Sequence, residues 1–104
     1  MIVEHALLPV RAGLSDEFRS AFSEAKAIIS RMPGFQSLTL SRCIERPDVF
    51  LLLVEWDRLE DHTIGFRDSP DYQQWRELLH RFYEPFPLVE HFEQIEQIEQ
   101  IEHL

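Results

Sequence analysis

The sequence predicts an α+β fold in which a four-stranded antiparallel sheet carries two helices on one face, the ferredoxin-like arrangement. A chain of 104 residues is long enough for one domain with a core and too short for two. Eight Phe and two Trp help supply the apolar surface that a core requires. The spacing of hydrophobic residues along the chain predicts six elements in the order strand, helix, strand, strand, helix, strand. Short right-handed connections between elements in that order give this arrangement.

The first two elements are a short strand and an amphipathic helix. Residues 2–8 are largely apolar and rich in strand formers. From Ser15, a candidate N-cap, the period becomes helical. The apolar stripe of this helix comprises Phe18, Ala21, Phe22, Ala25, Ile28, Ile29 and Met32. Pro33 and Gly34 end it, because proline disfavours helical backbone in the residue before it and glycine accepts a positive φ.

A hairpin follows. In residues 35–45, Leu38, Leu40, Arg42 and Ile44 alternate with smaller polar side chains, the pattern of a half-buried strand. Residues 46–48 predict a turn, and residues 49–56 are then almost continuously apolar. A central strand that is apolar on both faces would expose too much apolar surface in a monomer. We therefore expect a homodimer in which two sheets stack face to face as a dimeric α+β barrel.

The second helical region is interrupted. Asp57 is a candidate N-cap for a first piece, whose inward face carries Leu59, His62 and Phe66. Ser69 followed by Pro70 restarts the helix, as an N-cap followed by proline at the first helical position. The apolar stripe of the second piece comprises Tyr72, Trp75, Leu79 and Phe82. Residues 88–93 predict the last strand.

Composition excludes several classes of partner. A formal net charge of −9 argues against nucleic acid and against an anionic membrane surface, both of which bind clustered Lys and Arg. No stretch is long and apolar enough to span a bilayer, and the N-terminus has no signal-peptide pattern, so we expect a cytoplasmic protein. Cys43, the single cysteine, cannot form an intrachain disulfide and is interpreted as a small strand residue.

A combination of short motifs identifies a family. The motifs are Met32-Pro33-Gly34-Phe35, Val54-Glu55-Trp56, Asp61-His62, Gly65-Phe66-Arg67-Asp68-Ser69-Pro70, Trp75-Arg76 and Val89-Glu90-His91-Phe92. Together they make residues 1–93 resemble one branch of the antibiotic biosynthesis monooxygenase superfamily. The resemblance implies a dimeric barrel with a small hydrophobic pocket between the helices and the sheet of each subunit. Members of that superfamily include oxygenases that oxidise aromatic polyketides without metal or flavin, haem-degrading enzymes, isomerases of small signalling molecules and proteins without known activity.

Three functions are therefore expected alternatives. The first is a cofactor-independent monooxygenase that acts on a small planar organic molecule held in the hydrophobic pocket. The second is a non-catalytic dimer that binds a small ligand, and the third is an isomerase of a small metabolite. Fold alone does not choose among them, because one fold supports many reactions.

His62 is the candidate catalytic residue, because helical spacing places it on the inward face and an imidazole can exchange protons near neutral pH. A buried structural histidine is the alternative interpretation. Polar side chains along one flank of the second helix are candidates for substrate binding, namely Tyr72, Arg76, His80 and Tyr83. Aromatic candidates that could stack a flat substrate are Trp56, Phe66 and Trp75. No metal site and no cofactor are expected.

Two further features lie outside this set. His5 and His91 fall on strands that are neighbours in the expected sheet, so we expect them to lie close together. A structural hydrogen bond at the dimer interface is favoured over a metal site, which would need Glu55 or Glu90 as a third ligand. Residues 94–104 form a tail with a three-residue repeat, predicted to be either a short helix on the partner subunit or a frayed terminus.

We predict that the protein does not use haem. The haem-degrading members have an asparagine, a tryptophan and a histidine ligand where this chain has His5, Phe66 and Arg76. Titration with haem should give no saturable, stoichiometric shift of the Soret band. A stable one-to-one complex that is degraded with reductant and dioxygen would contradict this expectation.

Overall fold

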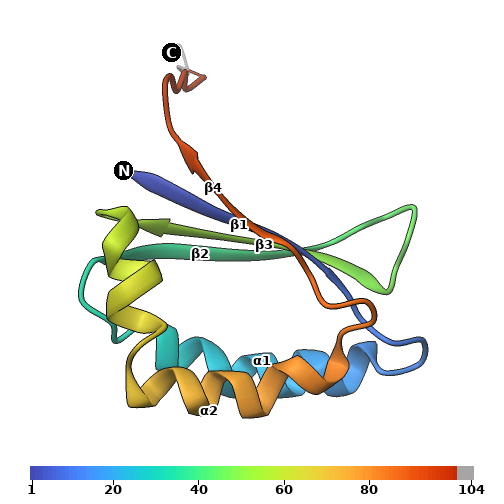
Figure 1. Cartoon of the computed structure of the whole chain (residues 1–104). Coiled ribbons are helices and arrows are strands. Elements are labelled where there is room, and N and C mark those ends of the chain that lie inside the picture. The colour runs from blue at the N-terminus through green and yellow to red at the C-terminus, as the bar shows by residue number, and fades with distance from the viewer. Residues whose placement is uncertain (101–104) are drawn as a thin grey trace.

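The computed structural model describes residues 1–100 and has the expected elements in the expected order. They are β1 (Ile2–Pro9), α1 (Ser15–Ile29), β2 (Phe35–Arg42), β3 (Val49–Trp56), a π-helix (Asp61–Phe66), α2 (Pro70–Leu79), a 3₁₀ turn (His80–Phe82) and β4 (Val89–Glu93). The strands form one antiparallel sheet in the order β2-β3-β1-β4, and both α-helices lie under the same face (Figure 1). The predicted ferredoxin-like α+β fold is confirmed.

The core forms between the sheet and α1 together with α2. All the predicted stripe residues within α1 are buried, and β1 and β3 contribute every second residue from the other side. Ser15 is not the N-cap, which is Leu14. The Ser15 hydroxyl instead donates to Asp48 Oδ1 at 2.7 Å and links the start of α1 to the turn before β3.

The interrupted second helical region follows the prediction in its second half and departs from it in the first. Ser69 caps α2, because its hydroxyl oxygen accepts from the Tyr72 backbone N–H at 3.2 Å. Asp57 does not cap the first piece, and its carboxylate accepts from Gln36 Nε2 at 2.6 Å. Leu59 is exposed, because it precedes the π-helix, whose wider turn does not follow the α-helical spacing assumed from sequence.

Gly34 positions the π-helix. Its φ is +85°, a conformation that glycine adopts without steric cost. The Asp61 carboxylate occupies the place where a Cβ on Gly34 would lie. The turn before β2 and the first residue of the π-helix therefore pack against each other directly.

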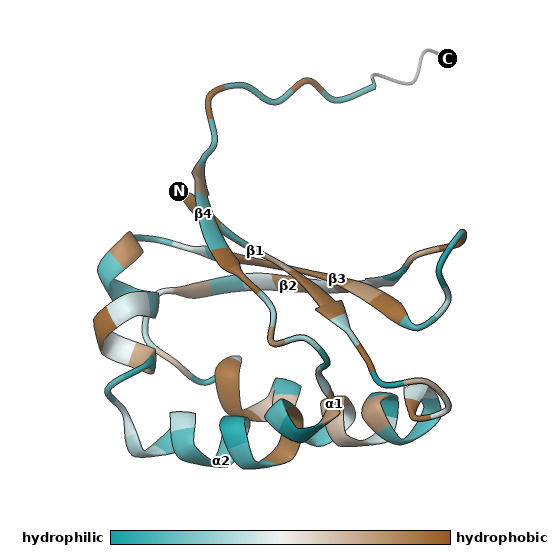
Figure 2. Ribbon diagram, turned by 45° about the vertical axis from the view of Figure 1, so that its right-hand side comes forward, coloured by the Kyte–Doolittle hydropathy of each residue, from teal (hydrophilic) through white to brown (hydrophobic). Residues whose placement is uncertain are grey.

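The face of the sheet opposite the helices is not covered by any element of residues 1–100 (Figure 1). The two central strands, β1 and β3, are nevertheless largely hydrophobic (Figure 2). Apolar side chains on this outer face include Val3, Leu7, Leu51, Leu53 and Phe92, and Leu7 and Phe92 are about half exposed.

Two other expectations concern the ends of elements and the tail. Ile44 lies beyond the end of β2 and is exposed. Residues 94–100 contain no helix in the single chain, and the part of the repeat around Ile101 lies outside the described residues. No helix within residues 1–100 is long and apolar enough to cross a membrane.

We predict that the outer face of the sheet binds a second copy of the chain. Light scattering at micromolar concentration should give twice the chain mass. Leu53→Glu should shift the mass to that of a monomer, because it places a charge at the centre of this face without touching the core under the sheet. Ile64→Glu, on the exposed side of the π-helix, is the matched control and should remain dimeric. A monomeric wild-type mass would show that this interpretation is wrong.

Candidate functional site

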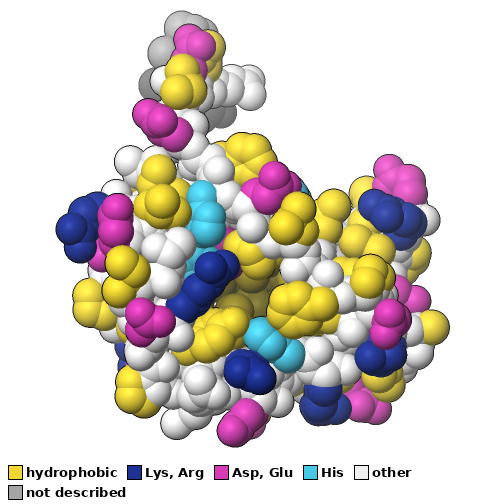
Figure 3. All heavy atoms as spheres, viewed as in Figure 1, with side chains coloured by type: hydrophobic (Ala, Val, Ile, Leu, Met, Phe, Trp, Pro, Cys, Tyr) yellow, Lys and Arg dark blue, Asp and Glu magenta, His cyan; other side chains and the backbone are white. Residues whose placement is uncertain are grey.

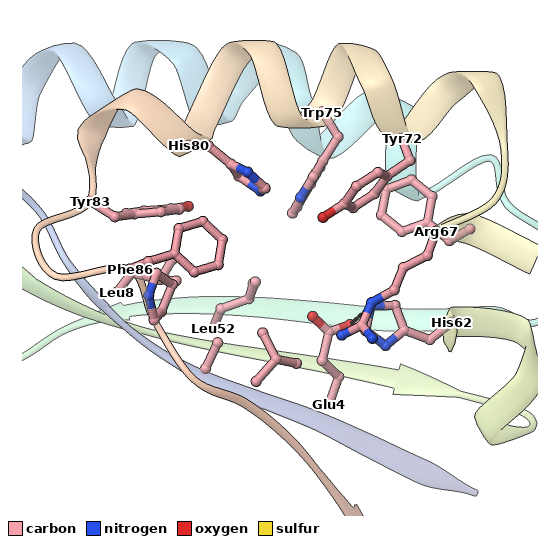
Figure 4. A pocket seen from close by; sticks show the side chains of 14 residues that line it. Glu4, Leu8, Leu52, His62, Arg67, Tyr72, Trp75, His80, Tyr83 and Phe86 are labelled. Atoms are coloured by element: carbon pink, nitrogen blue, oxygen red, sulfur yellow. Dashed lines mark ion pairs between the residues drawn. The ribbon is translucent and has the colours of Figure 1, made fainter. Parts of the chain in front are cut away.

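A cavity of about 220 Å³ lies between the sheet and the second helical region. In the space-filling view it appears as a hollow with a hydrophobic floor and with basic and histidine side chains at its rim (Figure 3). The lining residues are Glu4, Ala6, Leu8, Leu52, His62, Phe66, Arg67, Tyr72, Trp75, His80, Tyr83, Phe86, Pro87 and Val89. The close view shows polar groups gathered at one end and aromatic rings at the other (Figure 4).

Glu4 places a carboxyl group in the otherwise hydrophobic floor of the cavity. It lies on β1 in the same alternating set as Ala6 and Leu8, so strand geometry directs its side chain toward the helices. The side chain is only 5% exposed, and its carboxyl group points into the cavity (Figure 4). The indole Nε1–H of Trp56, from β3, donates to Glu4 Oε1 at 3.0 Å. A buried carboxyl without such a partner would cost several kcal/mol.

His62 is the second polar group and comes from the π-helix. It is 3% exposed and its ring stacks on Trp56, with 5.4 Å between the ring centroids and 19° between the planes. Its Nε2 lies 3.3 Å from Glu4 Oε1, and its Nδ1 lies 2.7 Å from Nε2 of His91 on β4. Both nitrogens of this buried ring therefore contact another titratable group.

Burial sets the protonation of these groups. It raises the pKa of Glu4 to about 7, against the smaller lowering effects of the Trp56 hydrogen bond and the Arg67 charge. Burial, with Arg67 and then His91, lowers the pKa of His62 to about 3. The pKa of His91 is lowered as well, by burial and then by the Arg67 charge. His62 is thus neutral near pH 7, and its 3.3 Å contact with Glu4 joins a carboxyl group to a neutral imidazole and is not an ion pair.

Arg67 brings a positive charge to the polar end. It directly follows the π-helix, and its guanidinium lies beside Glu4 and His62 at the rim of the cavity (Figure 4). The side chain is otherwise exposed, so it can move toward a ligand. An anion that forms next to Glu4 would lie within reach of this charge.

The opposite end is aromatic. His80, Tyr83 and Phe86 close this end, Trp75 extends from α2 over the middle of the cavity, and Tyr72, also from α2, lies beside Arg67 (Figure 4). The rings meet mostly edge to face, as His80 and Phe86 do at 4.9 Å between centroids. Burial, with Tyr72 and Glu4, raises the pKa of Tyr83, so its hydroxyl stays protonated.

The structure places most of the predicted site residues on this cavity. His62 lies at its polar end, and Phe66, Trp75, His80 and Tyr83 line its walls. Arg76 does not, because it projects from the exposed side of α2. Trp56 does not either: it is fully buried and contacts the lining residues Glu4, His62 and Phe66 from behind.

Sequence reasoning missed Glu4, Arg67 and Phe86 as cavity residues. For Glu4 a signal was present. It shares its strand face with Ala6 and Leu8, and an acidic residue in phase with a buried apolar set is rarely left there without a partner or function. Arg67 and Phe86 lie in irregular segments where periodicity gives no facing direction.

The expectation that the side chains of His5 and His91 lie together is wrong. The register pairs Glu4 with His91 and His5 with Glu90, so the two histidines point to opposite faces of the sheet. His5 packs edge to face on Phe92 on the outer face, and its buried Nδ1 has no hydrogen-bond partner among the described residues. Within residues 1–100, no three His, Cys, Asp or Glu side chains are arranged to hold a metal ion.

Comparison with known proteins identifies the family. Residues 1–78 match the family profile described as antibiotic biosynthesis monooxygenase. The chain belongs to this family. The Bacillus subtilis (strain 168) protein YczJ, itself uncharacterised, is 55% identical over 93 residues, which cover 89% of this chain and 98% of YczJ.

Several solved structures are similar to this member of the antibiotic biosynthesis monooxygenases. A candidate monooxygenase of the family from Bordetella bronchiseptica superposes with a TM-score of 0.86 at 31% identity, covering 90% of this chain and 96% of the other. SnoaB from Streptomyces nogalater, a cofactor-independent oxygenase, gives a TM-score of 0.83 at 18% identity, covering 95% and 97% of the two chains. The second likeness concerns the fold alone.

We predict that Glu4 gives the stability of this family member an unusual dependence on pH. Its pKa rises from an ordinary 4.5 to about 7, so its contribution to folding is complete below pH 4.5 and is lost as pH rises through 7. The loss is about 3 kcal/mol. His62 acts in the opposite direction, because its lowered pKa makes its contribution complete above pH 6.5 and lost as pH falls toward 3.

The measurement is urea unfolding of the wild type and of Glu4→Gln across this range. The unfolding free energy of the wild type minus that of Glu4→Gln should fall by about 3 kcal/mol as pH rises from 4.5 to 7. Glu90→Gln, on the outer face of the sheet, corrects for the change in net charge. A difference that does not change with pH would mean that Glu4 titrates as an ordinary carboxyl.

Proposed function

We propose that this protein is a cofactor-independent monooxygenase that oxidises a small hydroxylated aromatic molecule. The observation that carries the proposal is Glu4: a buried carboxyl with a pKa of about 7, which points into an aromatic cavity beside a neutral imidazole and a guanidinium. Membership of the antibiotic biosynthesis monooxygenase family supports the reaction type.

The size and polarity of the cavity favour a compact substrate. Its volume of about 220 Å³ is below the range of about 300–1,000 Å³ that is usual for drug-sized ligands. Aromatic side chains at one end suit a flat ring, and the acid–base groups at the other suit a single acidic hydroxyl. We therefore favour a mono- or bicyclic phenol, oriented with its hydroxyl toward Glu4.

Glu4 would act as the general base. A neutral phenol reacts slowly with dioxygen, whereas the electron-rich phenolate transfers an electron to it readily. A carboxylate whose pKa lies near the working pH removes such a proton efficiently. Arg67 would stabilise the phenolate, and the aromatic walls would exclude bulk water from the reacting centre.

The oxidation balances without another reductant. The ring carbon para to the phenolate oxygen bonds to dioxygen and gives a hydroperoxide. This hydroperoxide loses water and leaves a quinone. The substrate loses two hydrogens and gains one oxygen atom, and the other oxygen atom leaves as water. In these steps Glu4 accepts the hydroxyl proton, and the Glu4–His62 pair can return a proton to the departing oxygen.

We predict that Glu4→Gln lowers kcat by about 100-fold or more, because general-base catalysis contributes about 10²–10⁴ and glutamine keeps the bond from Trp56 without accepting a proton. The assay is dioxygen uptake and quinone absorbance with 1-naphthol and monocyclic phenols as probes. In the wild type the rate should rise with pH through about 7.

Glu90→Gln removes a carboxylate from the outer face of the same sheet and should keep wild-type turnover. Proton exchange into the probe without dioxygen uptake would favour an isomerase. Saturable binding of the probes without any turnover would favour the non-catalytic ligand-binding alternative. Equal turnover by the wild type and Glu4→Gln would show that Glu4 is not the base.

A further inference from the structure

A line of three titratable side chains in contact with one another leads out of the cavity. It begins at Glu4 on β1, passes through His62 on the π-helix and ends at His91 on β4. The heavy-atom distances are 3.3 Å between Glu4 Oε1 and His62 Nε2, and 2.7 Å between His62 Nδ1 and His91 Nε2. Three elements that are distant in sequence thus contribute one link each.

The line reaches the solvent at His91. This residue is half-buried, and its second ring nitrogen, Nδ1, neither bonds to another residue of 1–100 nor belongs to the buried atoms without a partner. His62, in contrast, is almost completely buried. The carboxyl group of Glu4 points into the cavity, so a bound substrate would cover it (Figure 4). While substrate is bound, the two histidines offer a route between Glu4 and water.

We propose that His62 and His91 form a proton relay that connects Glu4 with the solvent; the role of this relay in turnover rests on the function proposed above. The relay works because a neutral imidazole carries one proton and can hold it on either nitrogen. With Glu4 ionised, His62 donates from Nε2 to the carboxylate and accepts from His91 at Nδ1. With Glu4 protonated, the carboxyl donates to Nε2 and Nδ1–H donates to His91.

Switching between these two arrangements moves one proton. Glu4 O–H passes its proton to His62 Nε2, His62 Nδ1–H passes its proton to His91 Nε2, and His91 Nδ1–H passes its proton to water. Each imidazole ends neutral, with its proton on the other nitrogen, and the carboxylate is regenerated for the next substrate. The same steps in reverse deliver a proton to the cavity.

The surroundings of the relay disfavour the cationic form of either histidine. Arg67, at the end of the π-helix, is the charged residue that faces both histidines, with Glu4 on the side of the sheet. Burial and Arg67 lower the pKa of both rings, so the cationic forms are disfavoured. The stacked Trp56 ring holds the plane of His62 in place.

The relay can be tested without a substrate. In protein labelled with nitrogen-15 at histidine, His62 should remain neutral while its proton moves from Nδ1 to Nε2 as pH rises through about 7, when Glu4 ionises. His91 should change tautomer with it. In Glu4→Gln both rings should keep one tautomer. A His62 that keeps a single tautomer in the wild type would overturn the relay, whatever the enzymatic activity.

Turnover provides the second test. His91→Gln can still hydrogen-bond to His62 but cannot pass a proton on, so steady-state kcat with the phenol probes should fall about 10-fold or more. The single-turnover rate should be unchanged, because the resting Glu4 carboxylate suffices for one cycle. Added imidazole should restore steady-state turnover in His91→Ala. Glu93→Gln, an exposed residue two positions along β4, is the control and should behave as wild type.

The outcomes separate the two proposals. If the wild type turns over none of the probes, the proposed function fails and the tautomer experiment alone decides the relay. If His91→Gln and His91→Ala keep wild-type steady-state rates, or if imidazole rescues neither the rate nor its pH profile in His91→Ala, His91 is a structural residue and the relay is wrong.

Discussion

The site depends on one buried carboxyl. Glu4 would be costly at its position if it were left alone, because an ionised side chain loses its hydration under the sheet. Trp56 and His62 both converge on the same oxygen and reduce this cost, and Arg67 adds a positive charge at the rim. The remaining cost appears as the raised pKa, which makes the group able to exchange a proton near neutral pH. The burial of Glu4 therefore reduces folding stability at neutral pH and at the same time makes the group reactive in proton transfer.

The fold supplies this arrangement through register. Glu4 points under the sheet because of its phase on β1, and it lies opposite His91 because of the antiparallel pairing of β1 with β4. A slip of one residue would place His5 in the cavity and Glu4 on the outer face. The π-helix contributes the third group, in keeping with the frequent occurrence of such helices at functional sites. Each of these three side chains is therefore carried by a strand or helix that backbone hydrogen bonds hold in place, and none is carried by a mobile loop.

Sequence reasoning recovered the parts of the molecule that periodicity controls. The order of elements, the buried stripe of α1 and the cap of α2 at Ser69 all follow from spacing and local chemistry. It failed where two strands must be aligned with each other. Pairing His5 with His91 was wrong by one residue, because the sequence indicates which strands are neighbours but not their register. It also failed for Arg76, since a polar flank on a helix does not show which polar residues turn inward.

The central claim is that Glu4 holds its proton to near neutrality inside the cavity. Carbon-13 NMR of protein labelled at the glutamate carboxyl carbons measures this directly. We expect one carboxyl that titrates with a midpoint near 7, is absent from the spectrum of Glu4→Gln and is insensitive to Glu90→Gln. If the carboxyl that disappears in Glu4→Gln titrates near its ordinary value of 4.5, Glu4 is not poised for proton transfer and the account is contradicted.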